Sequence, residues 1–241
     1  METRVTEVAD GVHQLTTHIA EIDFGFNQYL ITGEEPMIFH TGMRGLFPLV
    51  SEAVARVVPI DTLRWVSFGH VEADECGAMN EFLAAAPHAT VVQGATGCMV
   101  SIGDLADRSP RALANDEVLD IGGHRIRWID TPHVPHGWEA GVIFDETTGT
   151  LFCGDLFARW SAYEATTTED VLAPALALDA TDDFGSWSLR PNSGDVVRHL
   201  ADLDATTLAP MHGSAYTGDC RTPLRGLAVA LDERITRSPA N

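Results

Sequence analysis

The chain contains no lysine: all 15 of its basic residues are arginines, and they face 35 acidic residues. Without a lysine amine the chain cannot form a Schiff base, supply a phosphate-loop lysine or use a lysine as general base. The formal net charge of −20 also argues against nucleic acid and anionic membranes, because both are bound through clustered cations. We therefore expect an acidic protein with no nucleic-acid partner.

Cysteine is scarce and long apolar runs are missing. The four cysteines form no C-x-x-C pair, which argues against a disulfide framework and predicts reduced, mostly buried thiols. No apolar run approaches the roughly 20 residues that a membrane span requires. The first residues mix charges and contain no apolar signal segment, so we expect a cytoplasmic protein.

What is present is a succession of short strand patterns and amphipathic helices. Apolar residues recur at helical spacing over 46–58 and 79–86, and a proline follows each stretch. Runs of β-branched and aromatic residues bounded by turn residues predict strands. These expected strands are 12–16, 29–32, 37–39, 63–68, 90–92, 118–119 and 124–129, with a hairpin over 141–153.

No repeat or linker divides the chain, so we expect a single domain over 1–241. The stretch 158–191 has weak periodicity and is rich in Thr, Asp and Ser, which predicts a long connection or a lid. Strands followed by helices, twice over, indicate helices packed on sheets, an α/β or α+β class.

Four potential metal ligands follow the expected strand 63–68 within six residues: His70, Glu72, Asp74 and Glu75. Alternation along an extended segment would direct the first three to one side, where they could reach one metal or two adjacent ones. The other interpretation is a polar helix start, because Asp74 and Glu75 would interact favourably with a helix dipole. This loop alone does not decide between them.

Three more residues of ligand type follow later strand-like segments. His136 lies in the turn after 124–129, Asp155 follows the hairpin, and His212 follows the apolar run 208–211. Histidine and carboxylate side chains at several strand ends can converge at one edge of a sheet and bind metal ions. Together with the H-x-E-x-D-E loop they predict a metal centre.

In this order the motifs resemble the metallo-β-lactamase fold, and within it the di-iron branch of flavodiiron proteins and oxygen-binding di-iron proteins. The resemblance covers nearly the whole chain and implies a four-layer αββα sandwich. The motifs that carry it are N-Q-Y-L at 27–30, H-T-G at 40–42, the H-x-E-x-D loop at 70–74, T-P-H-V-P-H-G-W-E at 131–139, C-G-D-L-F at 153–157 and P-M-H-G at 210–213.

The resemblance also implies a ligand set. It assigns one metal to His70, Glu72 and His136, the other to Asp74 and His212, and the bridge to Asp155. Glu75 departs from the family, in which this position is often histidine, so either Glu75 is an additional ligand or the second metal keeps a water or an open position. His40 and His133 are expected to support the ligands without binding metal; a core role for His40 is the alternative.

The donor set favours iron, with manganese or zinc as alternatives. Carboxylates stabilise the higher charge of an oxidised metal, whereas zinc has no redox chemistry and often takes nitrogen or sulfur. The resemblance then implies a non-haem di-iron protein that binds or reduces O2, nitric oxide or peroxide. It carries no flavin in the chain, so it would use an external electron donor, or act as a sensor on a signalling partner; a homodimer stays open.

The competing hypothesis is a hydrolase. The same two-metal site, loaded with zinc or manganese, could cleave an ester, thioester or phosphoester. The sequence does not separate sensor, reductase, oxygenase and hydrolase.

Overall fold

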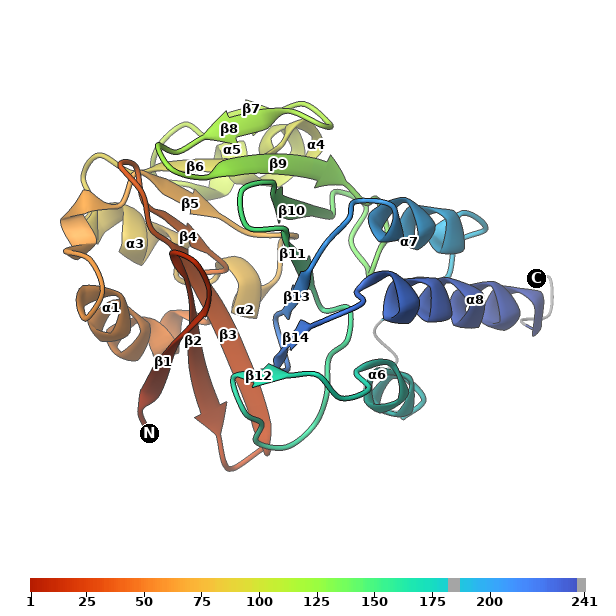
Figure 1. Ribbon diagram of the computed structural model, residues 1–241. Helices are drawn as coiled ribbons and strands as arrows, with labels where there is room; N and C mark the ends of the chain where they lie inside the picture. The colour runs from red at the N-terminus through yellow and green to blue at the C-terminus, as the bar shows by residue number, and fades with distance from the viewer. Residues whose placement is uncertain (182–186, 238–241) are drawn as a thin grey trace.

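The computed structural model describes residues 1–181 and 187–237, and they form two seven-stranded sheets packed face to face (Figure 1). The first sheet runs in the order β1 (Thr3–Ala9), β2 (Val12–Ile19), β3 (Phe24–Ile31), β4 (Met37–Phe39), β5 (Trp65–Ser67), β6 (Thr90–Gly94) and β7 (Arg111–Leu113). The second runs in the order β12 (Thr166–Thr167), β14 (Ala215–Thr217), β13 (Thr207–Pro210), β11 (Thr150–Gly154), β10 (Gly141–Asp145), β9 (Arg125–Asp130) and β8 (Val118–Asp120).

Connection length decides the strand directions. Tight turns join β1 to β2 and β2 to β3, and these pairs are antiparallel, as is β3 with β4. Helical connections separate β4, β5 and β6, and these strands pair in parallel, because a parallel neighbour needs a crossover. The carboxyl ends of the parallel strands therefore share one edge of the sheet, where the H-x-E-x-D-E loop begins.

Helices cover the outer face of each sheet. The helical segments that connect strands of the first sheet are η1 (Arg44–Leu46), α1 (Phe47–Ala55), η2 (Ile60–Thr62), α2 (Ala73–Cys76), α3 (Met79–Ala85), α4 (Ala95–Gly97), η3 (Cys98–Ile102) and α5 (Gly103–Leu105). The second sheet carries α6 (Leu172–Asp179), α7 (Ser193–Ala201) and α8 (Arg221–Arg237). The layers confirm the expected αββα sandwich (Figure 1).

Three apolar clusters fill the spaces between the four layers. One joins α1 and α3 to the first sheet, and another joins α6, α7 and α8 to the second. The third lies between the sheets and contains Trp128 and Tyr29, both with no exposed surface. Gly94 and Gly141 make room for Trp128, because a Cβ on either would lie within 2.8 Å of the Trp128 ring.

The expected strands are all present, with ends that differ by a few residues. The sequence pattern does not predict β1, because its seven residues, T-R-V-T-E-V-A, are mostly polar or half-exposed at the sheet edge. The stretch 158–191 contains β12 and α6, and α6 contacts α8; its residues 182–186 lie outside the described residues. Its role as a lid, and the single-domain organisation, stay predictions.

Within the residues that the structure describes, no helix is both long enough and apolar enough to cross a lipid bilayer.

Candidate metal centre

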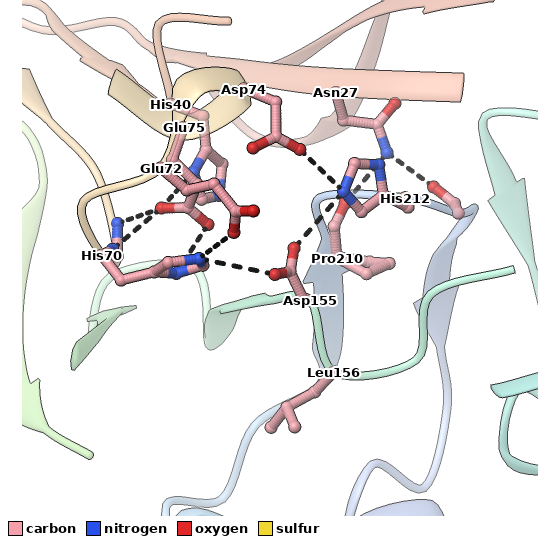
Figure 2. Close-up of polar contacts among 12 residues, drawn as sticks. Asn27, His40, His70, Glu72, Asp74, Glu75, Asp155, Leu156, Pro210 and His212 are labelled. Carbon is pink, nitrogen blue, oxygen red and sulfur yellow. Dashed lines mark hydrogen bonds and ion pairs between the residues drawn. The ribbon is translucent and has the colours of Figure 1, made fainter. Parts of the chain in front are cut away.

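The H-x-E-x-D-E loop leaves the end of β5 and turns directly into α2. Glu72 is extended, with φ −141° and ψ 158°, and the four-residue helix α2 begins at Ala73. Both sequence interpretations therefore describe part of the loop: Glu72 lies on extended backbone, whereas Asp74 and Glu75 lie in the first turn of a helix. Asp74 and Glu75 are consecutive residues of α2, and their side chains point in different directions (Figure 2).

His70, Glu72, His136 and Asp155 form one cluster, and they offer ligand atoms that all lie within 4.8 Å of one another. Oε2 of Glu72 lies 2.9 Å from Nε2 of His70 and 2.9 Å from Nε2 of His136. Oδ2 of Asp155 lies 3.6 and 3.5 Å from the same two nitrogens. Two nitrogens and two oxygens thus converge on one point.

His212 and Asp74 lie on the other side of Asp155 (Figure 2). Nε2 of His212 is 3.2 Å from Oδ2 of Asp74 and 3.4 Å from Oδ1 of Asp155. The two oxygens of Asp155 therefore face different groups of side chains, Oδ2 the first cluster and Oδ1 His212. This is the arrangement of a carboxylate that lies between two metal positions.

The donor chemistry at Asp155 fits metal ions. Its side chain is 10% exposed, and Oδ1 makes no hydrogen bond among the described residues. A buried carboxylate oxygen without a hydrogen bond is costly, and a cation beside it would remove that cost. Six side chains of nitrogen and oxygen type around this carboxylate match what iron or manganese prefers.

The His212 loop is held by β3. Nδ1 of His212 lies 2.9 Å from the carbonyl oxygen of Gly25, so Nδ1–H donates there and Nε2 is left to face the carboxylates. Asn27 donates to the carbonyls of Pro210 and Gly213, and the hydroxyl of Tyr29 also donates to Pro210. The N-Q-Y-L motif thus positions a loop almost two hundred residues away.

The carboxylates raise the pKa of the histidines that they surround. Burial lowers the pKa of His70, but the Glu75 charge and the hydrogen bond with Glu72 raise it to about 10. Hydrogen bonds from His136 and His70 lower the pKa of Glu72 to about 2. In the metal-free chain, a positive charge on His70 therefore offsets part of the negative charge of this cluster.

The other side of the centre behaves in the same way. Burial lowers the pKa of His212, whereas the facing carboxylates of Asp155 and Asp74 raise it to about 10. Burial raises the pKa of Asp155, but His212 and the other histidine charges hold it below its usual range. A metal ion that binds here must displace these protons.

Glu75 is separated from this group. It is fully buried, and its carboxylate faces His40 and the backbone of Gly69 and His70. The His40 ring is also fully buried, with Nδ1 3.2 Å from Oε2 of Glu75. The ring of His133 makes no hydrogen bond or ion pair within 1–181 and 187–237; its backbone N–H closes the turn onto Gly137.

Sequence reasoning missed several neighbours of the ligands. The rings of Phe24 and Phe26 lie 4.5 and 5.2 Å from the His212 ring and wall it on the β3 side. Oε1 of Glu139 accepts a hydrogen bond from the backbone N–H of Val71. These residues carry no ligand signal, because ordinary core phenylalanines and surface glutamates look the same in one sequence.

Comparisons with known proteins agree with this geometry. A family model described as "ODP family beta lactamase" matches residues 24–213. Diflavin flavoprotein A 1 of Nostoc sp. (strain PCC 7120) is 26% identical over 208 residues, which cover 80% of this chain and 35% of that protein. A protein of the same name from Thermosynechococcus vestitus is 29% identical over 135 residues, covering 55% and 23%. The chain thus spans about a third or less of the length of these relatives.

Solved structures show the same fold. The rubredoxin oxygen:oxidoreductase of Desulfovibrio gigas superposes with a TM-score of 0.79 at 16% identity, over 98% of this chain and 63% of that one. A fragment, 1–254, of diflavin flavoprotein A 5 from Nostoc sp. gives a TM-score of 0.74 at 18% identity and covers 98% of both chains. With the fold, the ordered motifs and a family model that matches most of its length, the chain belongs to the ODP family of beta-lactamase-fold proteins.

Proposed function

We propose that this chain is a non-haem di-iron protein that binds or reduces O2, with nitric oxide or peroxide as further small substrates. The observation that carries the proposal is the Asp155 carboxylate, whose two oxygens face two different groups of ligand-type side chains. The likeness in fold to solved structures of a rubredoxin oxygen:oxidoreductase and a flavodiiron core supports the same conclusion.

The chain's own residues supply two unequal sites. His70, Glu72 and His136 would hold one metal, Asp74 and His212 the other, and Asp155 would lie between them. Bound iron would supply the redox change that zinc lacks. Glu72 is 52% exposed and His136 24% exposed, so a small molecule can reach the centre from their side, whereas His70 and His212 are buried behind it.

We further propose that electrons come from an external donor, or that the chain passes a signal to a partner. The described residues are taken up by the four-layer sandwich and its proposed metal positions. The flavoprotein names of the matched relatives indicate the class of donor, a flavin-bearing protein.

Anaerobic purification tests the proposal. We expect two irons per chain after growth with iron available, and an optical spectrum that gains a near-ultraviolet charge-transfer band when air is admitted. Metal analysis and the spectra before and after oxygen are the two measurements.

Substitutions link the result to the site. We expect His70→Ala and His212→Ala each to lose at least one iron per chain and the oxygen-dependent band, because each removes a nitrogen that faces Asp155. His88→Ala, at an exposed histidine away from the cluster, is the matched control and should keep both. Two zinc ions with no response to oxygen, in protein made with iron available, would favour the hydrolase instead.

A further inference from the structure

Glu75 belongs to the H-x-E-x-D-E loop, yet its carboxylate faces away from both proposed metal positions. Oε2 lies 2.6 Å from the backbone nitrogen of Gly69 and 3.0 Å from that of His70, and it accepts both N–H groups. The same oxygen is 3.2 Å from Nδ1 of His40, and Oε1 is 3.4 Å from Nδ1 of His70. Among the described residues, this carboxylate thus contacts backbone N–H groups and the Nδ1 atoms of two imidazoles.

The helical backbone of α2 explains the direction. Consecutive side chains of a helix point about 100° apart, so Asp74 and Glu75 cannot face the same metal position as they stand. Asp74 faces His212, whereas Glu75 lies between His40 and His70 (Figure 2). Glycines make room for it, since a Cβ at Gly69 would lie 3.1 Å from Oε2.

The backbone of Glu75 is fixed as firmly as its side chain. The backbone N–H of Thr41 donates to the Glu75 carbonyl at 2.7 Å, and the Thr41 hydroxyl donates to the same oxygen at 3.2 Å. His40 precedes this contact with a left-handed φ of 61°, a conformation that non-glycine residues rarely adopt. The H-T-G turn therefore holds Glu75 from two sides, and turning its carboxylate toward Asp74 would break four contacts.

We propose that Glu75 is a positioning residue, not a ligand: its buried negative charge, 3.4 Å from Nδ1 of His70, keeps the proton on Nδ1, leaves Nε2 of His70 for the metal, and is itself held by His40 and Thr41. The inference rests on the proposed dimetal function. With Asp155, four side chains would hold the metal at His70, whereas three would hold the metal at Asp74 and His212. The second position would therefore bind its metal more weakly.

Cobalt(II) titration of the chelator-stripped chain, followed by visible absorption, tests this. We expect two binding steps in the wild type, the weaker one missing in Asp74→Asn and the stronger one missing in His70→Ala. Glu75→Gln should weaken the stronger step by about 10- to 100-fold, the usual effect of losing a residue that supports a metal-binding histidine. The weaker step should change less than about twofold.

Glu139→Gln is the matched control. Glu139 is another buried glutamate, in the turn between β9 and β10, but its carboxylate accepts the backbone N–H of Val71, which an amide oxygen also accepts. We expect both cobalt steps to be unchanged in this variant. An equal effect of the two substitutions would show that Glu75 only stiffens the loop, which would overturn the proposal.

Two other results would contradict the role of Glu75, and they differ in whether the proposed dimetal function survives. Loss of the weaker step in Glu75→Gln, with the stronger step intact, would make Glu75 a ligand of the second metal while leaving the dimetal function standing. Fewer than two cobalt ions in the wild type would end both proposals. If Glu75→Gln does not fold, histidine-¹⁵N NMR of the zinc-loaded wild type decides, because a His70 without a proton on Nδ1 contradicts the role assigned to Glu75.

Discussion

At the scale of single residues, the centre is a set of imidazoles whose charge partners are already in place. His70, His136 and His212 each have a carboxylate oxygen within about 3 Å of Nε2. Protons on these rings balance the carboxylates in the metal-free chain, and metal ions would do so in the loaded one. Proton and metal binding therefore compete at the same atoms.

This competition predicts a strong pH dependence of metal binding. Since the carboxylates raise the pKa of both His70 and His212 to about 10, each ring carries a proton at neutral pH that a metal must displace. We expect metal affinity to rise with pH up to about 10, where both rings lose these protons without help from a metal. Titration calorimetry in buffers of different ionisation enthalpy should find protons released on zinc binding at neutral pH. Zinc uptake without proton release would contradict the pairing described above.

Residue types and their order were enough to name the ligand candidates, because His70, Glu72, Asp74, His136, Asp155 and His212 each follow a strand. The direction of Glu75 was not predictable from spacing. It depends on where α2 begins, because an offset of one residue would turn the Asp74 and Glu75 side chains by about 100° around the helix axis. The partner of Glu75, His40, lies more than thirty residues earlier, which no local pattern relates to it.

At the scale of elements, strands joined by short turns were easier to predict than strands at the edges of the sheets. The β2–β3 and β10–β11 regions show strong apolar patterns and turn residues, and the structure confirms both. The strand β1 and the two-residue strand β12 lie at sheet edges, where one side is solvent and polar residues are tolerated. Their pairing is decided by tertiary contacts, so the sequence alone does not reveal it.

The packing of the Trp128 ring against the neighbouring strand β10 predicts that Gly141 cannot be replaced. A Cβ at this position would lie 2.1 Å from the ring of the fully buried Trp128. We expect Gly141→Ala to lower the free energy of unfolding by ~1–3 kcal/mol, the usual cost of overpacking a core. The backbone N–H of Gly141 also donates to the carbonyl of Gly69, so metal retention should fall as well.

Gly45 provides the control for that substitution. A Cβ there meets no atom within 4 Å, so Gly45→Ala should change the free energy of unfolding by no more than ~1 kcal/mol. Urea denaturation of the three proteins makes the comparison. Equal stability of the two alanine variants would mean that Trp128 moves aside freely.

At the scale of the whole molecule, the centre joins the two halves of the sandwich. His70, Glu72 and Asp74 follow β5 of the first sheet, whereas His136, Asp155 and His212 follow strands of the second. The sandwich was expected from the resemblance that the ordered motifs carry, whereas the strand and helix patterns alone indicated only an α/β or α+β class. Two divalent ions would also offset part of the formal charge of −20.

Metal removal should therefore weaken the fold as a whole. Ligands that come from both sheets converge only in the folded chain, so free metal at a hundred times its dissociation constant adds ~2.7 kcal/mol to the free energy of unfolding for each site. For a chain of this length, one such site corresponds to a rise in Tm of roughly 5–10 °C. Calorimetric melting with zinc, and after chelation, measures the difference. His212→Ala, which keeps the cluster around His70, should show about half of the wild-type shift, whereas an unchanged shift would mean that the stabilising metal binds elsewhere.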